Sequence, residues 1–245
     1  MNTSVIYRII LSVFIIFSSL NTLVGQNLTD DQGRKQGKWV KKYARGTVRY
    51  EGTFADDKPV GEFNYYYVDG KLKAVTVYSS SGDSAATKSY HKNGKPMAEG
   101  SYFRQKKTGK WLYYSDVDGA LIAEENYDNG LLDGPHTTFY PASGKPAEII
   151  EYKQGRREGM LLKLFPDGST MTEGTYVNDS LDGDFTLYYP DGKIQLKGAY
   201  DHGMHTGEWK YFDEDGNQLD DDEFRYEILE NDTLEFDFPI KTKKD

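Results

Sequence analysis

A glycine that recurs at an almost constant spacing dominates this chain of 245 residues. An aromatic residue always follows it eight positions later, and successive glycines lie 24 or 25 residues apart. The glycines are Gly46, Gly70, Gly94, Gly119, Gly144, Gly168, Gly192 and Gly216, and the aromatics are Phe54, Tyr78, Tyr102, Tyr127, Tyr152, Tyr176, Tyr200 and Phe224. Because the glycine-to-aromatic offset never varies, the two extra residues are expected before the glycine. A fixed period of this length indicates stacked supersecondary units.

A second glycine opens most units, and a large residue usually follows it after two positions. The openers are Gly37, Gly61, Gly109, Gly134, Gly159, Gly183 and Gly207, with Ala85 in the irregular third unit. The large residues are Trp39, Phe63, Trp111, His136, Leu161, Phe185 and Trp209. Each unit therefore reads as strand, turn, strand and loop.

The turns carry suitable chemistry, as in Phe165–Gly168 and Tyr189–Gly192, where proline and aspartate precede glycine. Proline fixes φ at the first central position, and glycine tolerates the positive φ that follows. We predict an all-β fold: an elongated single array of eight tandem antiparallel β-hairpins over residues 37–226, after a lead-in at 26–36. Its sixteen strands, about 4.8 Å apart, give a length on the order of 75 Å.

The C-terminal residues alternate between apolar and polar, which predicts a capping strand over residues 227–240. This strand is expected to cover an edge that would otherwise aggregate. A charged tail at 241–245 follows Pro239 and ends the pairing.

The N-terminus reads as a signal peptide over residues 1–25, with cleavage before Gln26. Its apolar stretch, Ile9–Phe17, is too short to cross a bilayer of about 30 Å. We therefore expect a secreted or periplasmic protein without stable membrane insertion after cleavage. An uncleaved anchor that begins near Val5 is the alternative.

Composition narrows the function classes. The chain has no cysteine, which excludes disulfides, thiolate metal sites and cysteine nucleophiles. Its 30 basic and 39 acidic residues give a net charge of -9, which argues against a nucleic-acid partner. Two short basic runs, 104–107 and 153–157, are expected to be solvated loops.

No residue is predicted to be catalytic, to ligate a metal or to hold a cofactor, and the binding residues remain undefined. The serine-hydrolase elbow, the zinc-protease motif and the Walker loop are absent from the sequence. His202 and His205 are expected in a solvated loop rather than at a metal, and the acidic run 213–223 lacks EF-hand spacing. The aromatic ladder is expected to form the core of the array rather than a glycan or peptide site.

Three short motifs resemble the O-glycosylation sites of some bacterial envelope systems. They are centred on Ser84, Ser180 and Thr233, which are all expected in loops or turns.

The units resemble a known family, the MORN-repeat variant. The resemblance is carried by residues 183–192 followed by Lys197-Gly-Ala-Tyr200, and by residues 109–114 with residues 99–102. It covers about residues 33–226. Val75–Thr76 and Ile149–Ile150 depart from it, because other copies carry Glu-Gly there.

The resemblance implies a hairpin array used for interaction rather than for one chemistry. We therefore expect an exported non-enzymatic scaffold that binds a protein partner of unknown identity. Proteins of this kind are often labelled YwqK-type antitoxins, so neutralisation of a partner toxin by binding is the first alternative. A carbohydrate-binding protein is the second.

Overall fold

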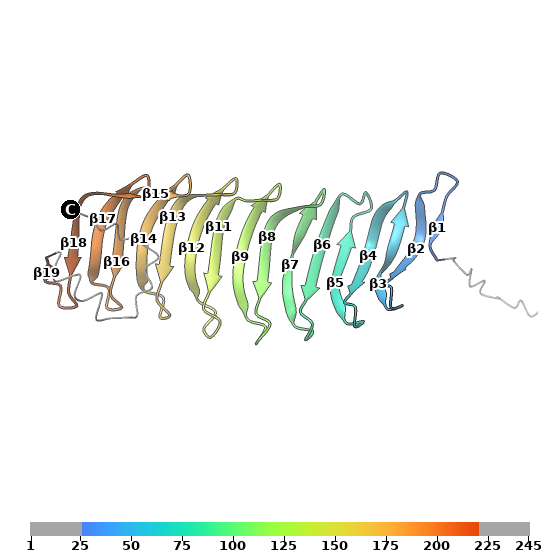
Figure 1. The fold of residues 1–245 in the computed structure, drawn as a ribbon, viewed down its shortest axis with the longest axis horizontal. Coiled ribbons are helices and arrows are strands. Elements are labelled where there is room, and N and C mark those ends of the chain that lie inside the picture. The colour runs from blue at the N-terminus through green and yellow to red at the C-terminus, as the bar shows by residue number, and fades with distance from the viewer. Residues whose placement is uncertain (1–25, 221–245) are drawn as a thin grey trace, which may run out of the picture.

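The computed structural model describes residues 26–220, which form one 19-stranded antiparallel sheet without a helix in that range (Figure 1). The strands are β1 Leu28–Thr29, β2 Lys35–Lys42, β3 Val48–Ala55, β4 Lys58–Tyr66, β5 Leu72–Tyr78, β6 Ser84–Tyr90, β7 Pro96–Phe103, β8 Lys106–Tyr114, β9 Leu121–Asp128, β10 Leu131–Leu132, β11 Gly134–Phe139, β12 Pro146–Lys153, β13 Arg156–Leu164, β14 Thr170–Val177, β15 Ser180–Leu181, β16 Gly183–Tyr188, β17 Ile194–Asp201, β18 Met204–Phe212 and β19 Gln218–Leu219. The predicted elongated hairpin array is confirmed.

Each long strand pairs with the next long strand in the sequence, so the array grows one hairpin at a time (Figure 1). The short β1 adds to the N-terminal edge of β2, with Leu28 opposite Gln36. The predicted capping strand, Phe224 and Thr233 lie outside the described residues. Within the described range, no helix is long and apolar enough to cross a membrane.

All eight turn glycines have a positive φ, from +66° at Gly144 to +99° at Gly168. In six turns the glycine N–H donates to the carbonyl three residues back, as in Gly70 to Tyr67. Gly119 and Gly144 instead donate to the carbonyl four residues back, at Ser115 and Tyr140. The two extra residues of the repeat thus lie in these turns, before the glycine, as predicted.

The opening glycines also have positive φ, from +63° at Gly109 to +113° at Gly159. This backbone accompanies β-bulges, and the register shifts where β7 meets β8 and where β12 meets β13. Ala85 replaces the opener in the third unit, and β5 pairs with β6 without a shift. A residue with a Cβ disfavours the left-handed conformation, so Ala85 gives this junction a straight ladder.

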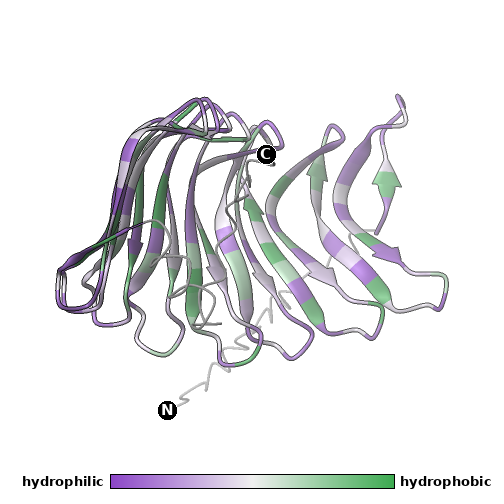
Figure 2. Cartoon of the chain, turned by 60° about the vertical axis from the view of Figure 1, so that its left-hand side comes forward, coloured by the Kyte–Doolittle hydropathy of each residue, from purple (hydrophilic) through white to green (hydrophobic). Residues whose placement is uncertain are grey.

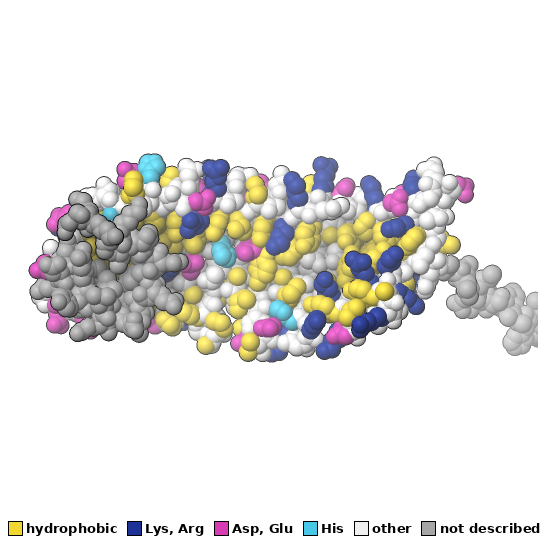
Figure 3. Space-filling model, viewed as in Figure 1, with side chains coloured by type: hydrophobic (Ala, Val, Ile, Leu, Met, Phe, Trp, Pro, Cys, Tyr) yellow, Lys and Arg dark blue, Asp and Glu magenta, His cyan; other side chains and the backbone are white. Residues whose placement is uncertain are grey.

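The two faces of the sheet differ sharply in burial. The twelve buried side chains of residues 26–220 all lie on the face that carries Phe63, Trp111 and Phe185, which we call the aromatic face. Alternate residues point to the opposite face. A band of hydrophobic side chains runs along the array (Figure 3), and the curvature of the strands is seen in Figure 2.

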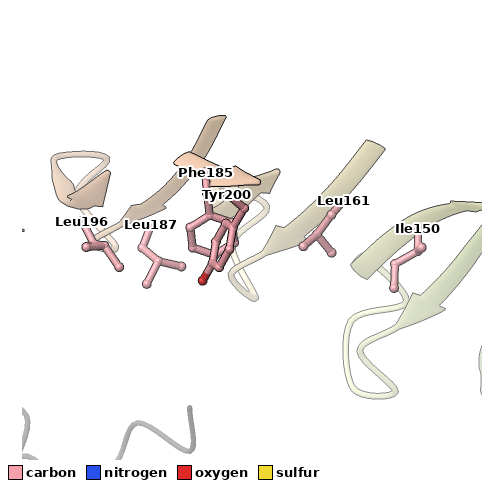
Figure 4. Close-up of a cluster of buried hydrophobic side chains, with 6 residues drawn as sticks. All are labelled: Ile150, Leu161, Phe185, Leu187, Leu196 and Tyr200. Carbon is pink, nitrogen blue, oxygen red and sulfur yellow. The ribbon is translucent and has the colours of Figure 1, made fainter. Parts of the chain in front are cut away.

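A cluster of buried hydrophobic side chains lies in the C-terminal half of the array (Figure 4). It comprises Ile150, Leu161, Phe185, Leu187, Leu196 and Tyr200. These side chains come from β12, β13, β16 and β17, so the core is a stripe shared by successive hairpins.

Candidate binding surface

A column of side chain contacts on the aromatic face joins each unit to the next. The large residue that follows an opener lies over a glycine of the preceding strand, as Phe63 lies over Gly52 and Trp111 over Gly100. Trp209 over Gly198 repeats the arrangement. A Cβ on any of these three glycines would overlap the ring above it. The glycine of the Glu-Gly pair therefore provides room for the aromatic ring of the next unit.

The units that depart from Glu-Gly change both members of the contact. Thr76 faces Thr87, and their hydroxyls are 2.8 Å apart in a hydrogen bond. Ile150 is paired with Leu161, so two medium-sized side chains replace a glycine and a ring.

The fourth and fifth units place a polar pair in the column. Glu125 Oε1 lies 4.0 Å from His136 Nε2, and both side chains are about four-fifths buried, with 20% and 22% exposed. Among the described units this pair occurs at one boundary, which gives the otherwise repetitive face a distinctive position.

Lys107 lies beside this pair in a cage of aromatic rings. Its Nζ lies 4.6 Å from the ring centroids of both Trp111 and Tyr127, and 5.1 Å from that of Tyr113. The ammonium also donates to Tyr113 Oη at 2.5 Å and to Tyr127 Oη at 3.1 Å. Cation–π contacts and hydrogen bonds together hold this partly buried charge.

The hydroxyl of Tyr127 donates to Glu125 Oε2 at 2.6 Å, which completes a chain from Lys107 to His136. Burial, and then hydrogen bonding with Glu125, raise the pKa of Tyr113 far above its ordinary value. Tyr113 therefore remains a neutral hydroxyl. We call Lys107, Tyr113, Glu125, Tyr127 and His136 the central polar cluster, the candidate site on this face.

The position of Lys107, two residues before an opening glycine, carries a basic residue in other units as well. Lys35 lies over the ring of Phe54 at 4.7 Å, and Arg157 lies over Tyr176 at 4.2 Å. His205 stacks on Trp209 with centroids 4.0 Å apart. The sequence analysis did not identify this row of basic residues stacked on aromatic rings. Their constant spacing of two residues before the opening glycine was the signal that could have revealed it.

The two basic runs were expected to be solvated loops, and this expectation is only partly correct. Arg104 and Gln105 do form the exposed turn of the first run, with φ of +47° and +66°. Lys107 and Arg157 instead return to the aromatic face. The expectation failed because strand alternation continues through the run and directs these side chains toward tyrosine rings.

The two histidines of the 202–205 segment are separated. His202 lies in an exposed loop with Nδ1 at 2.5 Å from Asp201 and 3.6 Å from Asp182, and these carboxylates raise its pKa. His205 packs on Trp209, and burial lowers its pKa. The expected solvated loop thus holds for His202 alone. Asp182, Asp201 and His202 offer three ligand atoms within 4.8 Å, a small and exposed set for a metal.

The acidic segment begins with a structured turn. Asp213 accepts hydrogen bonds from the backbone and side-chain nitrogens of Asn217, and Gly216 has a φ of +90°. Asp213 therefore closes the eighth hairpin turn. Residues 221–223 lie outside the described range.

The two described glycosylation candidates are strand residues rather than loop residues. Ser84 is the first residue of β6, and Ser180 is the first residue of β15. The expectation of loops was wrong for both, because backbone pairing begins at the serine.

The opposite face is built from a different repeated contact. Tyr66 donates to Glu51, Tyr114 to Glu99 and Tyr188 to Glu173, each across fifteen residues. In each Glu-Gly pair, the glutamate therefore accepts a tyrosine hydrogen bond on the opposite face, and the glycine makes room for a ring on the aromatic face.

The aromatic ladder is only half-buried. Of its seven described members, Tyr200 alone is buried, while Phe54, Tyr78, Tyr102, Tyr127, Tyr152 and Tyr176 are partly exposed. Over residues 26–220 the sheet is a single layer (Figure 1), so these rings belong to the core and to an accessible surface at once.

A match to a family model supports the repeat. The sequence model of the MORN repeat variant matches residues 86–103 and 181–202. No curated protein matches the chain. The crystal structure of TarM is similar at 16% identity over 39% of this chain and 20% of that one, with a TM-score of 0.29. The crystal structure of TcdB2-TccC3-TEV is similar at 13% identity over 79% of this chain and 11% of that one, with a TM-score of 0.18. This chain spans well under two thirds of either protein.

Proposed function

We propose that this chain, which carries repeats of the MORN variant, is a non-enzymatic scaffold that binds a protein partner on its aromatic face. MORN repeats commonly mediate binding to proteins or membranes, and the family is generally non-enzymatic. The observation that carries the proposal is the half-buried row of tyrosines on a single-layer sheet. Tyrosine, tryptophan and arginine are the residue types that dominate protein interfaces.

The central polar cluster supports a specific rather than a sliding contact. A surface made of similar units offers a partner several equivalent positions one repeat apart. Glu125 and His136 break that equivalence, because other described boundaries have glycine with a ring, two threonines or two aliphatic residues. A partner that pairs with this cluster binds in one register.

Affinity capture from extracts of the producing cells tests the proposal. The matched variants are Glu125→Gln with His136→Gln on the aromatic face, and Glu124→Gln on the opposite face. Recovery of the partner should fall on the order of tenfold with the first variant, because loss of a desolvated polar contact weakens binding. Recovery should be unchanged with the second. Equal recovery with both folded variants would contradict the proposed face.

Export is part of the proposal. Its support is the sequence pattern of residues 1–25. Fractionation with intact-mass measurement tests it: the exported protein should begin at Gln26 and appear in the periplasm or medium. A full-length chain retained in the membrane would instead favour an anchored scaffold.

A further inference from the structure

Charge is segregated along the array in a way that the net charge conceals. Residues 26–114, which contain β1 to β8, have seventeen basic and nine acidic residues, a net charge of +8. Residues 115–220, which contain β9 to β19, have eight basic and twenty-one acidic residues, a net charge of -13. The Lys and Arg side chains accordingly crowd the N-terminal half in Figure 3.

The segregation is sharpest along the edge formed by the eight hairpin turns. We call this the turn edge; its segments are 43–47, 67–71, 91–95, 115–120, 140–145, 165–169, 189–193 and 213–217. With two flanking residues on each side, the first three turns carry eight basic residues and one acidic residue. The other five carry seven acidic residues and three basic ones.

These charges face solvent. The basic residues of the first three turns are Lys41, Lys42, Arg45, Arg49, Lys71, Lys73, Lys92 and Lys95, and all but Lys95 are exposed. The acidic residues of the later turns are Asp116, Asp118, Asp167, Asp191, Asp213, Glu214 and Asp215, and all but Asp213 are exposed. They are therefore available to a partner along the whole edge.

The middle of the turn edge also presents apolar side chains, beside Asp116 and Asp118. Val117, in the fourth turn, is 82% exposed, the most exposed large hydrophobic residue among those described. The fifth turn presents Pro141 and Ala142, which are both exposed. Exposed apolar side chains at the centre, with charged residues around them, are common at protein interfaces.

The two charged halves are much longer than the distance over which charges interact. Each half contains at least eight strands at about 4.8 Å, whereas the Debye length is about 8 Å at physiological salt. A partner therefore meets the two signs separately. A polyanion laid along the edge would be attracted by one half and repelled by the other.

We propose that two copies of this chain associate antiparallel along their turn edges. The first turn of each copy, with Lys42 and Arg45, then faces the eighth turn of the other, with Glu214 and Asp215. A two-fold axis between the fourth and fifth units brings Val117 against Pro141 and Ala142. Such an interface is closed, because every contact occurs twice, so it yields a dimer rather than a filament. It leaves the aromatic face available and does not depend on the function proposed above.

Sedimentation of the exported chain tests the pairing. The chain should sediment with twice its own mass at low salt and should dissociate as salt rises, because the attraction between exposed charges is screened. The variant Lys42→Glu with Arg45→Glu, and the variant Glu214→Lys with Asp215→Lys, should each weaken the dimer about tenfold or more. An equimolar mixture of the two variants should restore association, because each carries the partner's lost charge.

The control variant reverses charge on the other edge, with Arg104→Glu and Lys106→Glu, and should leave the dimer unchanged. Circular dichroism verifies that every variant folds. A monomer at all concentrations in low salt would overturn the proposal. A dimer unaffected by the turn-edge variants, or one broken by the control, would overturn it as well.

Discussion

The indole of Trp111 lies over Gly100, across the boundary between the third and fourth repeat units. The glycine has no side chain, so its backbone lets the ring pack against the sheet, and Trp111 is only 3% exposed. At the boundary between the fifth and sixth units, two medium-sized side chains, Ile150 and Leu161, are paired instead. The sizes of the two facing side chains at a repeat boundary are therefore matched, and the matched pair differs between boundaries.

This relationship predicts strong coupling in a double-mutant cycle. Gly100→Ile alone should reduce the free energy of unfolding by at least about 1–3 kcal/mol, because the new side chain overlaps the indole. Combined with Trp111→Leu, which copies the Ile150–Leu161 pair, the same change should cost less than additivity requires. We expect a coupling energy of about 0.5–3 kcal/mol from denaturant unfolding.

Gly174 offers a graded comparison for the same effect. A Cβ there would lie 3.0 Å from Phe185 Cδ2, a milder conflict than at Gly100. Gly174→Ala should therefore destabilise the protein less than Gly100→Ala does. Equal losses for these two alanine variants would show that the ring contact is not the cause.

The opening glycines predict a second effect, from backbone strain. Gly109 has a φ of +63°, and an alanine there should lower stability by about 1–2 kcal/mol. The reciprocal change, Ala85→Gly, affects a junction without a bulge and should cost only about 0.5–1 kcal/mol through chain entropy. Thermal unfolding of the two variants measures the difference, and a larger loss for Ala85→Gly would contradict the assignment of the bulge.

Lys107 is expected to stabilise the central polar cluster. Lys107→Met keeps most of the stem but removes the ammonium from three rings and two tyrosine hydroxyls. The loss should be about 1–2 kcal/mol, the size of a partly desolvated cation–π contact with charged hydrogen bonds. Lys106→Met, on the exposed neighbour, should change stability by less than about 0.5 kcal/mol.

The raised pKa values of several tyrosines predict that the protein loses stability at alkaline pH. Hydrogen bonding with Glu51 first, and burial second, raise the pKa of Tyr66 to about 12. Burial first, and Glu99 second, raise the pKa of Tyr114 to about 12. The folded state holds these protons more tightly than the unfolded state does. The resulting contribution to the free energy of unfolding is therefore fully present below the unfolded pKa of about 10 and is lost between about pH 10 and 12.

Tyrosinate absorbance measures this titration directly. These groups should ionise late, together with the loss of the circular dichroism signal of the sheet. The Tyr66→Phe and Tyr114→Phe variants should reduce the amplitude of the late phase. A titration complete near pH 10 with the sheet intact would contradict the raised pKa values.

The hairpin array could be predicted because its signals are local and repeated. Positive φ at a turn glycine is a property of the backbone, so the turns at Gly70 and Gly168 were fixed by sequence. The longer turns that end at Gly119 and Gly144 followed from the constant offset to the next aromatic.

The candidate site could not be predicted in the same way. Lys107 and Glu125 lie in different strands, and their relation through Tyr127 depends on the register across β8 and β9. A bulge near Gly109 also shifts the register between β7 and β8, and such a shift decides which face a side chain occupies. The pairing of Lys107 with Tyr102, which the local run 104–107 does not encode, places Lys107 on the aromatic face.

Partner binding on the aromatic face is tested most directly by photo-crosslinking at two adjacent positions. A benzophenone side chain replaces Tyr102, which is half-buried on the aromatic face, or Phe103, which is 48% exposed on the opposite face. The account predicts a partner crosslinked through position 102 and little or none through position 103. Crosslinking through position 103 alone, with both variants folded, would contradict it.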